Sequence, residues 1–149
     1  MSNPNIKPNE EAVLVGLIDP DAYAAAAYST GYISMATFDA IQAILLVGDI
    51  VSTGTVDAKL EQAQDGSGTG LKDIIGKSIT QLTQAGTDSN KQAIINCWSD
   101  ELDVTGGFTH VRLTVTLGTA GADMGALVLG HHARYSPATD ATTIDEVVS

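Results

Sequence analysis

Residues 109–117 show the most regular alternation of apolar and polar positions in the chain. In an extended strand successive side chains point to opposite faces, so this pattern sends the aliphatic residues to one face. The polar residues, His110 and Arg112 among them, then lie on the other face. The segment therefore predicts a half-buried β-strand.

Similar patterns recur along the chain, with turn-forming residues between them. Residues 56–61 alternate in the same way and place Asp57, Lys59 and Glu61 on a wet face. Five further runs complete the predicted strands: residues 32–38, 40–47, 77–83, 92–98 and 124–129. The predicted connections are Asp39 and residues 48–49, 65–70, 86–90, 106–107 and 118–121, which are rich in Gly, Asp, Asn and Ser. About seven or eight strands at this spacing predict an all-β fold, an antiparallel β-sandwich or jelly-roll-like barrel.

Residues 40–47 carry apolar side chains on both faces of the predicted strand, unlike their neighbours. Such a run indicates a central strand, or a strand whose outer face is covered by something else. The cover could be a partner subunit or the protein's own loops. Ile44 and Leu46 are accordingly candidate contact residues.

The two ends of the chain differ from the part between them. Residues 1–11 are polar, contain two prolines and show no period, and residues 136–149 have a similar character. These segments predict an extended N-terminal arm and a C-terminal tail flanking one sandwich domain at residues 12–135. The short segment at residues 22–28 is read as an irregular or extended lead-in.

Composition adds detail to this picture. Hydrophobic residues make up 44% of the 149 residues but aromatic residues only 5%, so the core is expected to consist of Ala, Val, Ile and Leu. The single Cys97 excludes an internal disulfide, and its apolar surroundings predict a small buried hydrophobe. Trp98, in the same run, is expected in the core as well.

The charge balance and the N-terminal sequence limit the classes of partner that the protein is expected to bind. Eighteen acidic and seven basic residues give a formal net charge of −11, which argues against nucleic-acid binding because phosphates favour a basic face. The N-terminus lacks the basic and apolar regions of a secretory signal, so synthesis and retention in the cytoplasm are expected. The apolar runs are far shorter than the roughly 20 residues that span a bilayer, so no membrane partner is expected.

The residue types of an active site are sparse. His131 and His132 are adjacent and should point to opposite faces of a strand, which does not favour a shared metal ion. Residues 65–70 alternate oxygen-bearing side chains with glycine but lack the spacing of a calcium or phosphate loop, so a hairpin loop is predicted. The acids at residues 100–103 read as a solvated connection. We therefore expect no enzyme activity, catalytic residue, metal or cofactor.

Several short sequence segments spread over the chain together resemble a known family. They lie at residues 33–39, 54–59, 68–74, 79–82, 100–103, 108–112 and 133–137. In this order they resemble a family of small proteins of tailed phages and prophages that lie among the head-structure genes. The resemblance covers roughly residues 15–137 and rests on these dispersed short segments, not on a catalytic motif.

The resemblance implies a virion structural protein, made in the host cytoplasm and located on the capsid surface. Its expected role is that of a decoration or cement protein that binds the outside of the major capsid protein lattice, often as a homotrimer at three-fold positions. A head–tail junction or tail protein is the first alternative, and a carbohydrate-binding β-sandwich module is the second. The candidate contact residues, besides those in the apolar run, are Ile6, Lys7, Pro8, His110, Arg112, His132, Arg134 and Tyr135.

Overall fold

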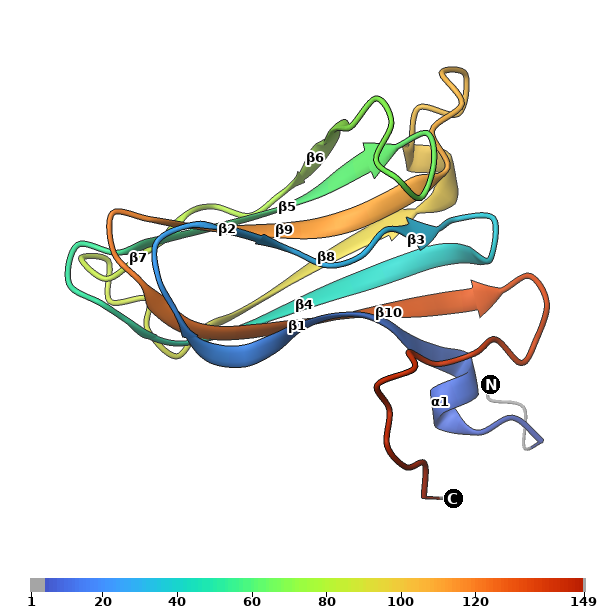
Figure 1. Ribbon diagram of the computed structural model, residues 1–149, viewed down its shortest axis with the longest axis horizontal. Helices are drawn as coiled ribbons and strands as arrows, with labels where there is room; N and C mark the ends of the chain where they lie inside the picture. The colour runs from blue at the N-terminus through green and yellow to red at the C-terminus, as the bar shows by residue number, and fades with distance from the viewer. Residues whose placement is uncertain (1–4, 149) are drawn as a thin grey trace.

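The computed structural model describes residues 5–148, and its regular secondary structure is almost entirely antiparallel β-strand (Figure 1). Its elements in chain order are α1 (Pro8–Glu11), β1 (Ala12–Tyr23), β2 (Ala27–Ser29), β3 (Ile33–Ser34), β4 (Phe38–Ile50), β5 (Thr55–Ala63), β6 (Lys72–Ser78), β7 (Leu82–Thr83), β8 (Gln92–Trp98), the 3₁₀ turn η1 (Ser99–Glu101), β9 (His110–Gly118) and β10 (Ala122–Ala133). The all-β prediction is confirmed.

The strands form two facing sheets. Sheet A has the order β1-β10-β4-β8, and sheet B has the order β2-β9-β5-β6, with β3 also pairing with β9 and β7 with β5. We count β2 and β3 as one interrupted strand and β6 and β7 as another. Consecutive strands then alternate between sheets A and B from β1 to β5, the next strand stays in sheet B, and the alternation resumes from β8 to β10. This double Greek key is the jelly roll, an architecture of viral capsid domains, lectins and cupins.

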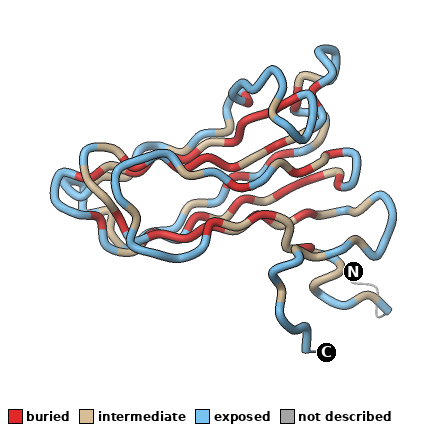
Figure 2. Tube along the Cα trace, in the orientation of Figure 1, coloured by how far each residue is buried: buried red, intermediate tan, exposed pale blue. Residues whose placement is uncertain are grey.

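The core lies between the two sheets. Its largest fully buried side chains are aliphatic or small, as the low aromatic content predicts: Val13, Ile41, Val56, Leu60, Cys97, Val111, Leu113, Val115 and Val128. Figure 2 shows this burial concentrated on the strands, whereas loops and termini are largely exposed. Gly130 belongs to this packing, because a Cβ atom there would lie 2.6 Å from the ring of Phe38.

Several predicted element boundaries are wrong. The twelve-residue β1 was not predicted, because register shifts at Leu14/Gly16 and Ile18/Asp21 interrupt its alternation. The predicted strand at residues 32–38 is only the two-residue β3 followed by a turn, and Asp39 lies inside β4 instead of in a connection. The predicted strand at 77–83 divides between the end of β6 and the short β7.

The termini are less extended than the sequence suggested. The N-terminal segment contains the single turn α1, and the tail passes back to the free edge of β1 at Leu14 before it turns away from the sheet (Figure 1). There the Ala141 N–H donates to the Leu14 carbonyl at 2.8 Å, and the Leu14 N–H donates to Asp140 at 3.2 Å. Asp140 also accepts from the Asn9 side chain at 2.8 Å, so it joins both terminal segments to the domain. Residues 1–4 of the predicted arm, and Ser149 of the tail, lie outside the described residues.

Cys97 confirms the prediction of a buried thiol, with 1% of its surface exposed. Burial, followed by the nearby Glu101 carboxylate, raises the pKa of this thiol to about 11. Because the reactive thiolate is then scarce at pH 8, we expect the native protein to resist Ellman's reagent and the urea-unfolded protein to react fully. Rapid stoichiometric labelling of the native protein would contradict this burial.

Candidate interaction surface

The outer face of sheet A is apolar across all four strands. One cross-strand row joins Leu17 of β1 to Leu127 of β10, then to Ile44 of β4 and Ile94 of β8. Each of these residues alternates with buried neighbours that point into the core, so this row points outward. With Leu14, Leu129 and Leu46 in the adjacent rows, the seven residues form what we call the apolar face.

Exposure and charge set this face apart from the rest of the chain. Leu46 is 49% exposed and Ile94 57% exposed. The polar positions in these rows are the amides Gln42, Asn96 and Gln92, and none of the rows contains an Asp, Glu, Lys or Arg. A protein with a net charge of −11 therefore has three uncharged rows on this sheet face, and Asp21 and Asp123 lie beside Leu46 at one end of them. Contiguous exposed apolar surface of this kind marks interaction sites on soluble proteins.

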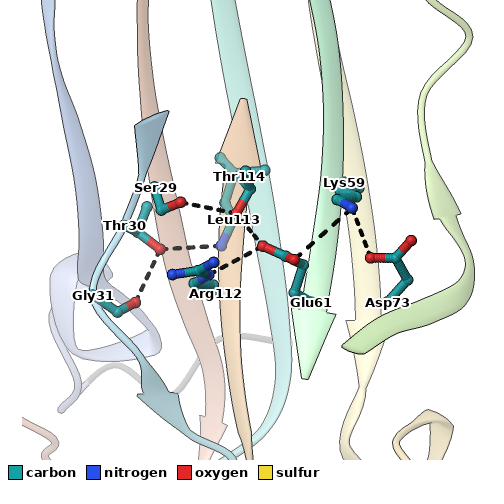
Figure 3. Close-up of polar contacts among 9 residues, drawn as sticks. All are labelled: Ser29, Thr30, Gly31, Lys59, Glu61, Asp73, Arg112, Leu113 and Thr114. Carbon is teal, nitrogen blue, oxygen red and sulfur yellow. Dashed lines mark hydrogen bonds and ion pairs between the residues drawn. The ribbon is translucent and has the colours of Figure 1, made fainter. Parts of the chain in front are cut away.

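The outer face of sheet B is polar, as is usual for an antiparallel sheet that faces water. At its centre Glu61 is 8% exposed and accepts hydrogen bonds from Arg112, at 3.0 Å, and from Thr114 (Figure 3). Lys59 lies 3.8 Å from Glu61 and 2.7 Å from Asp73, so the ion pairs continue across β5 to β6. The predicted wet face is confirmed, but its central groups are shielded and paired.

These contacts bear on two of the candidate contact residues. The Arg112 guanidinium is held by Glu61 and lies 5.2 Å from the ring centroid of Tyr32. His110 Nδ1 lies 2.8 Å from the hydroxyl of Thr109. Both side chains are therefore engaged within the chain, on the sheet opposite to the apolar face.

Aromatic side chains lie at one end of the apolar face. The indole of Trp98 stacks on the imidazole of His132, with ring centroids 5.7 Å apart and planes 12° apart. Trp98 is 52% exposed, so its expected place in the core is wrong. It lies outside because Ile95 and Cys97 take the inward positions of β8.

The two adjacent histidines also differ from the prediction. His132 has a positive φ of 53°, which breaks the alternation of β10, so its ring turns toward Trp98 on the outer side. His131 pairs with Ala40 in the same outward rows, and its ring centroid lies 6.4 Å from that of His132. Partial burial, and secondly the neighbouring His132, lower the pKa of His131.

Of the terminal candidates, Ile6 and His132 lie at this same end. Ile6 lines a hollow together with Glu10, Glu11, His131 and His132. Tyr135 is 87% exposed, and Arg134 pairs with Asp39 at 3.0 Å. Lys7 and Pro8 are exposed at the start of α1. The structure thus places Ile6 and His132 together at the aromatic end of the apolar face, whereas Arg134 lines a separate hollow with Met35 and Phe108.

The remaining polar motifs have structural contacts. Asp65 accepts hydrogen bonds from the side chain and backbone of Thr69 and from the Ser67 N–H, which lowers the pKa of its carboxyl group and fixes the β5–β6 loop. Lys77 pairs with Glu101 at 2.8 Å and Lys72 with Asp103 at 2.6 Å.

Within residues 5–148, no three metal-ligating side chains lie close enough together to hold an ion. The same residues contain no helix long and apolar enough to cross a membrane.

Sequence reasoning missed most of the apolar face. It identified Ile44 and Leu46 but not Leu14, Leu17, Ile94, Leu127, Leu129 or Trp98. A signal was present in β8, where Ile94, Asn96 and Trp98 occupy alternate positions opposite the inward Ile95 and Cys97. The leucines of β1 and β10 could be assigned to the outer face only from their register with β4.

Comparisons with known proteins give little further information. No protein-family model and no curated protein matches the chain. Among solved structures, a chain in the structure of infectious bursal disease virus Gx strain is similar with a TM-score of 0.45 and 13% identity, covering 91% of this chain and 39% of that one. A chain in the cryo-EM structure of broad bean stain virus has a TM-score of 0.40 and 11% identity, covering 100% of this chain and 98% of that one. These scores are too low to support an argument, so the fold assignment rests on the strand order of the chain itself.

Proposed function

We propose that this chain is a virion structural protein of the tailed-phage type, which decorates and stabilises the outer surface of a capsid by binding the major capsid protein. The observation that carries the proposal is the apolar face, because uncharged rows on the sheet of a strongly acidic protein suit contact with another protein surface. Its aromatic end has the composition of interface hot spots, in which Trp, Tyr and Arg are enriched. The resemblance of short sequence segments to a phage protein family and the jelly-roll fold support the same role.

Such a protein would act by mass action. A ligand that binds the assembled lattice better than free subunits stabilises the assembly by an amount set by its concentration relative to its Kd. Repetition over many equivalent sites multiplies that gain, and no bond is made or broken.

The proposal is tested by cosedimentation of the purified protein with expanded capsids of its own phage that lack it. We expect saturable binding in a fixed ratio to the major capsid protein. Light scattering of the free protein, in the same buffer, tests the trimer implied by the resemblance. Binding only to tails or to connector-containing particles would replace the capsid role with the tail or head–tail junction role.

A second candidate function is carbohydrate binding, and the exposed Trp98 favours it. Its indole borders a hollow lined also by Gln42, Asn96 and His131, and an aromatic ring beside amide side chains is a combination that can hold a sugar. Titrating the intrinsic Trp fluorescence with host-surface glycans tests this function. Saturable quenching without capsid binding would favour the glycan role over the capsid role.

The N-terminal segment gives a separate prediction. Deleting residues 1–11 should leave the sandwich folded, because the described part of this segment, residues 5–11, supplies none of the buried core side chains. Capsid affinity should fall roughly tenfold, since Ile6 and the start of α1 are lost beside the aromatic end. Circular dichroism and cosedimentation measure the two effects, and deletion of residues 145–149 is the control. Unchanged saturation of capsids by the shortened chain would remove the arm from the interface.

A further inference from the structure

The four sheet edges of the sandwich differ in how they are protected against pairing with another chain. The edge of β1 carries two register shifts, Pro20 and the returning tail. The β2/β3 edge is split into strands of three and two residues. The edge of β6 carries Lys72, Asp73 and Lys77 and a positive φ at Gly76. Charges, bulges, proline and short strands are the features that prevent edge-to-edge association.

The fourth edge, β8, has none of these features. Its seven residues, Gln92–Trp98, contain no charged residue, proline or glycine, and they pair with β4 without a register shift. Two adjacent isoleucines give it high β-propensity. An uninterrupted, uncharged edge strand of this kind is suited to adding another strand.

The hydrogen-bond pattern identifies which backbone groups of β8 are free. The Val47 N–H donates to the Lys91 carbonyl at 3.0 Å, so the odd-numbered residues of this segment direct their backbone groups toward β4. The even-numbered residues therefore face away from β4. In agreement, the Trp98 N–H points outward and donates to the Glu101 carboxylate at 2.8 Å. Among the described residues, no partner is seen for the backbone groups of Ile94 and Asn96.

From this pattern we infer that β8 pairs antiparallel with β8 of a second copy of this chain. The register with Ile95 on the two-fold axis pairs Ile94 of each copy with Asn96 of the other, where both backbone groups are available. The outer pair, Gln92 with Trp98, lacks one donor because the Trp98 N–H is held by Glu101. Lys91, which pairs with Asp88 at 2.7 Å, precedes the strand, and the exposed Asp100 follows it, so antiparallel pairing brings Lys91 of each copy toward Asp100 of the other. The uncharged strand is thus flanked by complementary charges.

This dimer goes beyond the proposed function and has a consequence for it. Directly opposite residues of antiparallel strands project to the same side of a sheet. Pairing of β8 with its copy therefore gives one eight-stranded sheet, twice the four strands of sheet A, with both apolar faces on the same side. Two apolar faces side by side would bind a repeating surface bivalently. The two-fold contact also differs from the trimer that the family resemblance implies.

The test measures the mass of the full chain by sedimentation equilibrium over a range of concentrations. We expect the wild-type protein to dimerise. Asn96→Pro should raise the dimer dissociation constant roughly tenfold or more, because it removes the free-edge donor twice per dimer while leaving the bonds to β4 intact. Asn96→Ala is the matched control, since it loses the same side-chain contact to Gln42 but keeps the N–H and should remain dimeric.

Hydrogen exchange provides a readout that needs no variant. The amides of Ile94 and Asn96 should be protected at high protein concentration and should lose that protection on dilution. A monomer or a trimer at all concentrations would overturn the two-fold pairing, as would an undiminished dimer in Asn96→Pro. Loss of the dimer would lower the avidity for a repeating surface but leave each monomer able to bind capsids saturably in a fixed ratio, so failure of the dimer is distinguishable from failure of the proposed function.

Discussion

Replacing Trp98 by alanine is expected to weaken capsid binding roughly 30-fold or more, which corresponds to about 2 kcal/mol or more. The indole is half exposed, stacks on His132 and lies at the aromatic end of the apolar face. A large ring held in place by a neighbour loses little side-chain freedom when it is buried by a partner, so it contributes strongly to affinity. Cosedimentation of the variant over a concentration series measures the change.

A matched control separates this effect from a general loss of exposed apolar surface. Ile75 is 97% exposed on β6 of the opposite sheet and is not one of the residues of the apolar face. Ile75→Ala should bind capsids like the wild-type protein, and both variants should unfold within about 1 kcal/mol of it. Equal binding by Trp98→Ala and wild type would mean that the aromatic end makes no contact with the capsid.

Replacing Leu113 by alanine is expected to lower the free energy of unfolding by about 2–5 kcal/mol. Leu113 lies on β9 in the middle of sheet B, is 1% exposed, and belongs to the core cluster between the sheets. Removal of its side chain leaves a cavity that the two close-packed sheets can fill only in part. Urea denaturation followed by circular dichroism measures the loss.

The control for this change lies three residues further along the same strand. Thr116 is exposed on the outer face of β9, so Thr116→Ala should change the free energy of unfolding by no more than about 1 kcal/mol. A loss below 1 kcal/mol for Leu113→Ala would contradict the close packing of the sheets at this point.

The sequence by itself determined the fold class and much of the core. Period-two alternation in residues 109–117 and 56–61 corresponds to β9 and β5, whose apolar positions are buried as predicted. Residues 40–47, which are apolar on both faces, lie in β4, a central strand of sheet A. The Gly-rich residues 65–70 lie in the β5–β6 connection. These features depend on local pattern, which a single strand carries within itself.

Tertiary structure alone decided which apolar residues form a surface. The bulges in β1 interrupt its two-residue alternation, so the sequence pattern did not predict this strand. The positive φ of His132 directs its ring toward Trp98, and a histidine in the sequence does not predict that backbone conformation. The apolar face exists because β1, β10, β4 and β8, far apart in the chain, are placed side by side in one register. Strand order and register arise from long-range pairing, so the sequence pattern of one strand shows that it has two apolar faces but not which of them faces solvent.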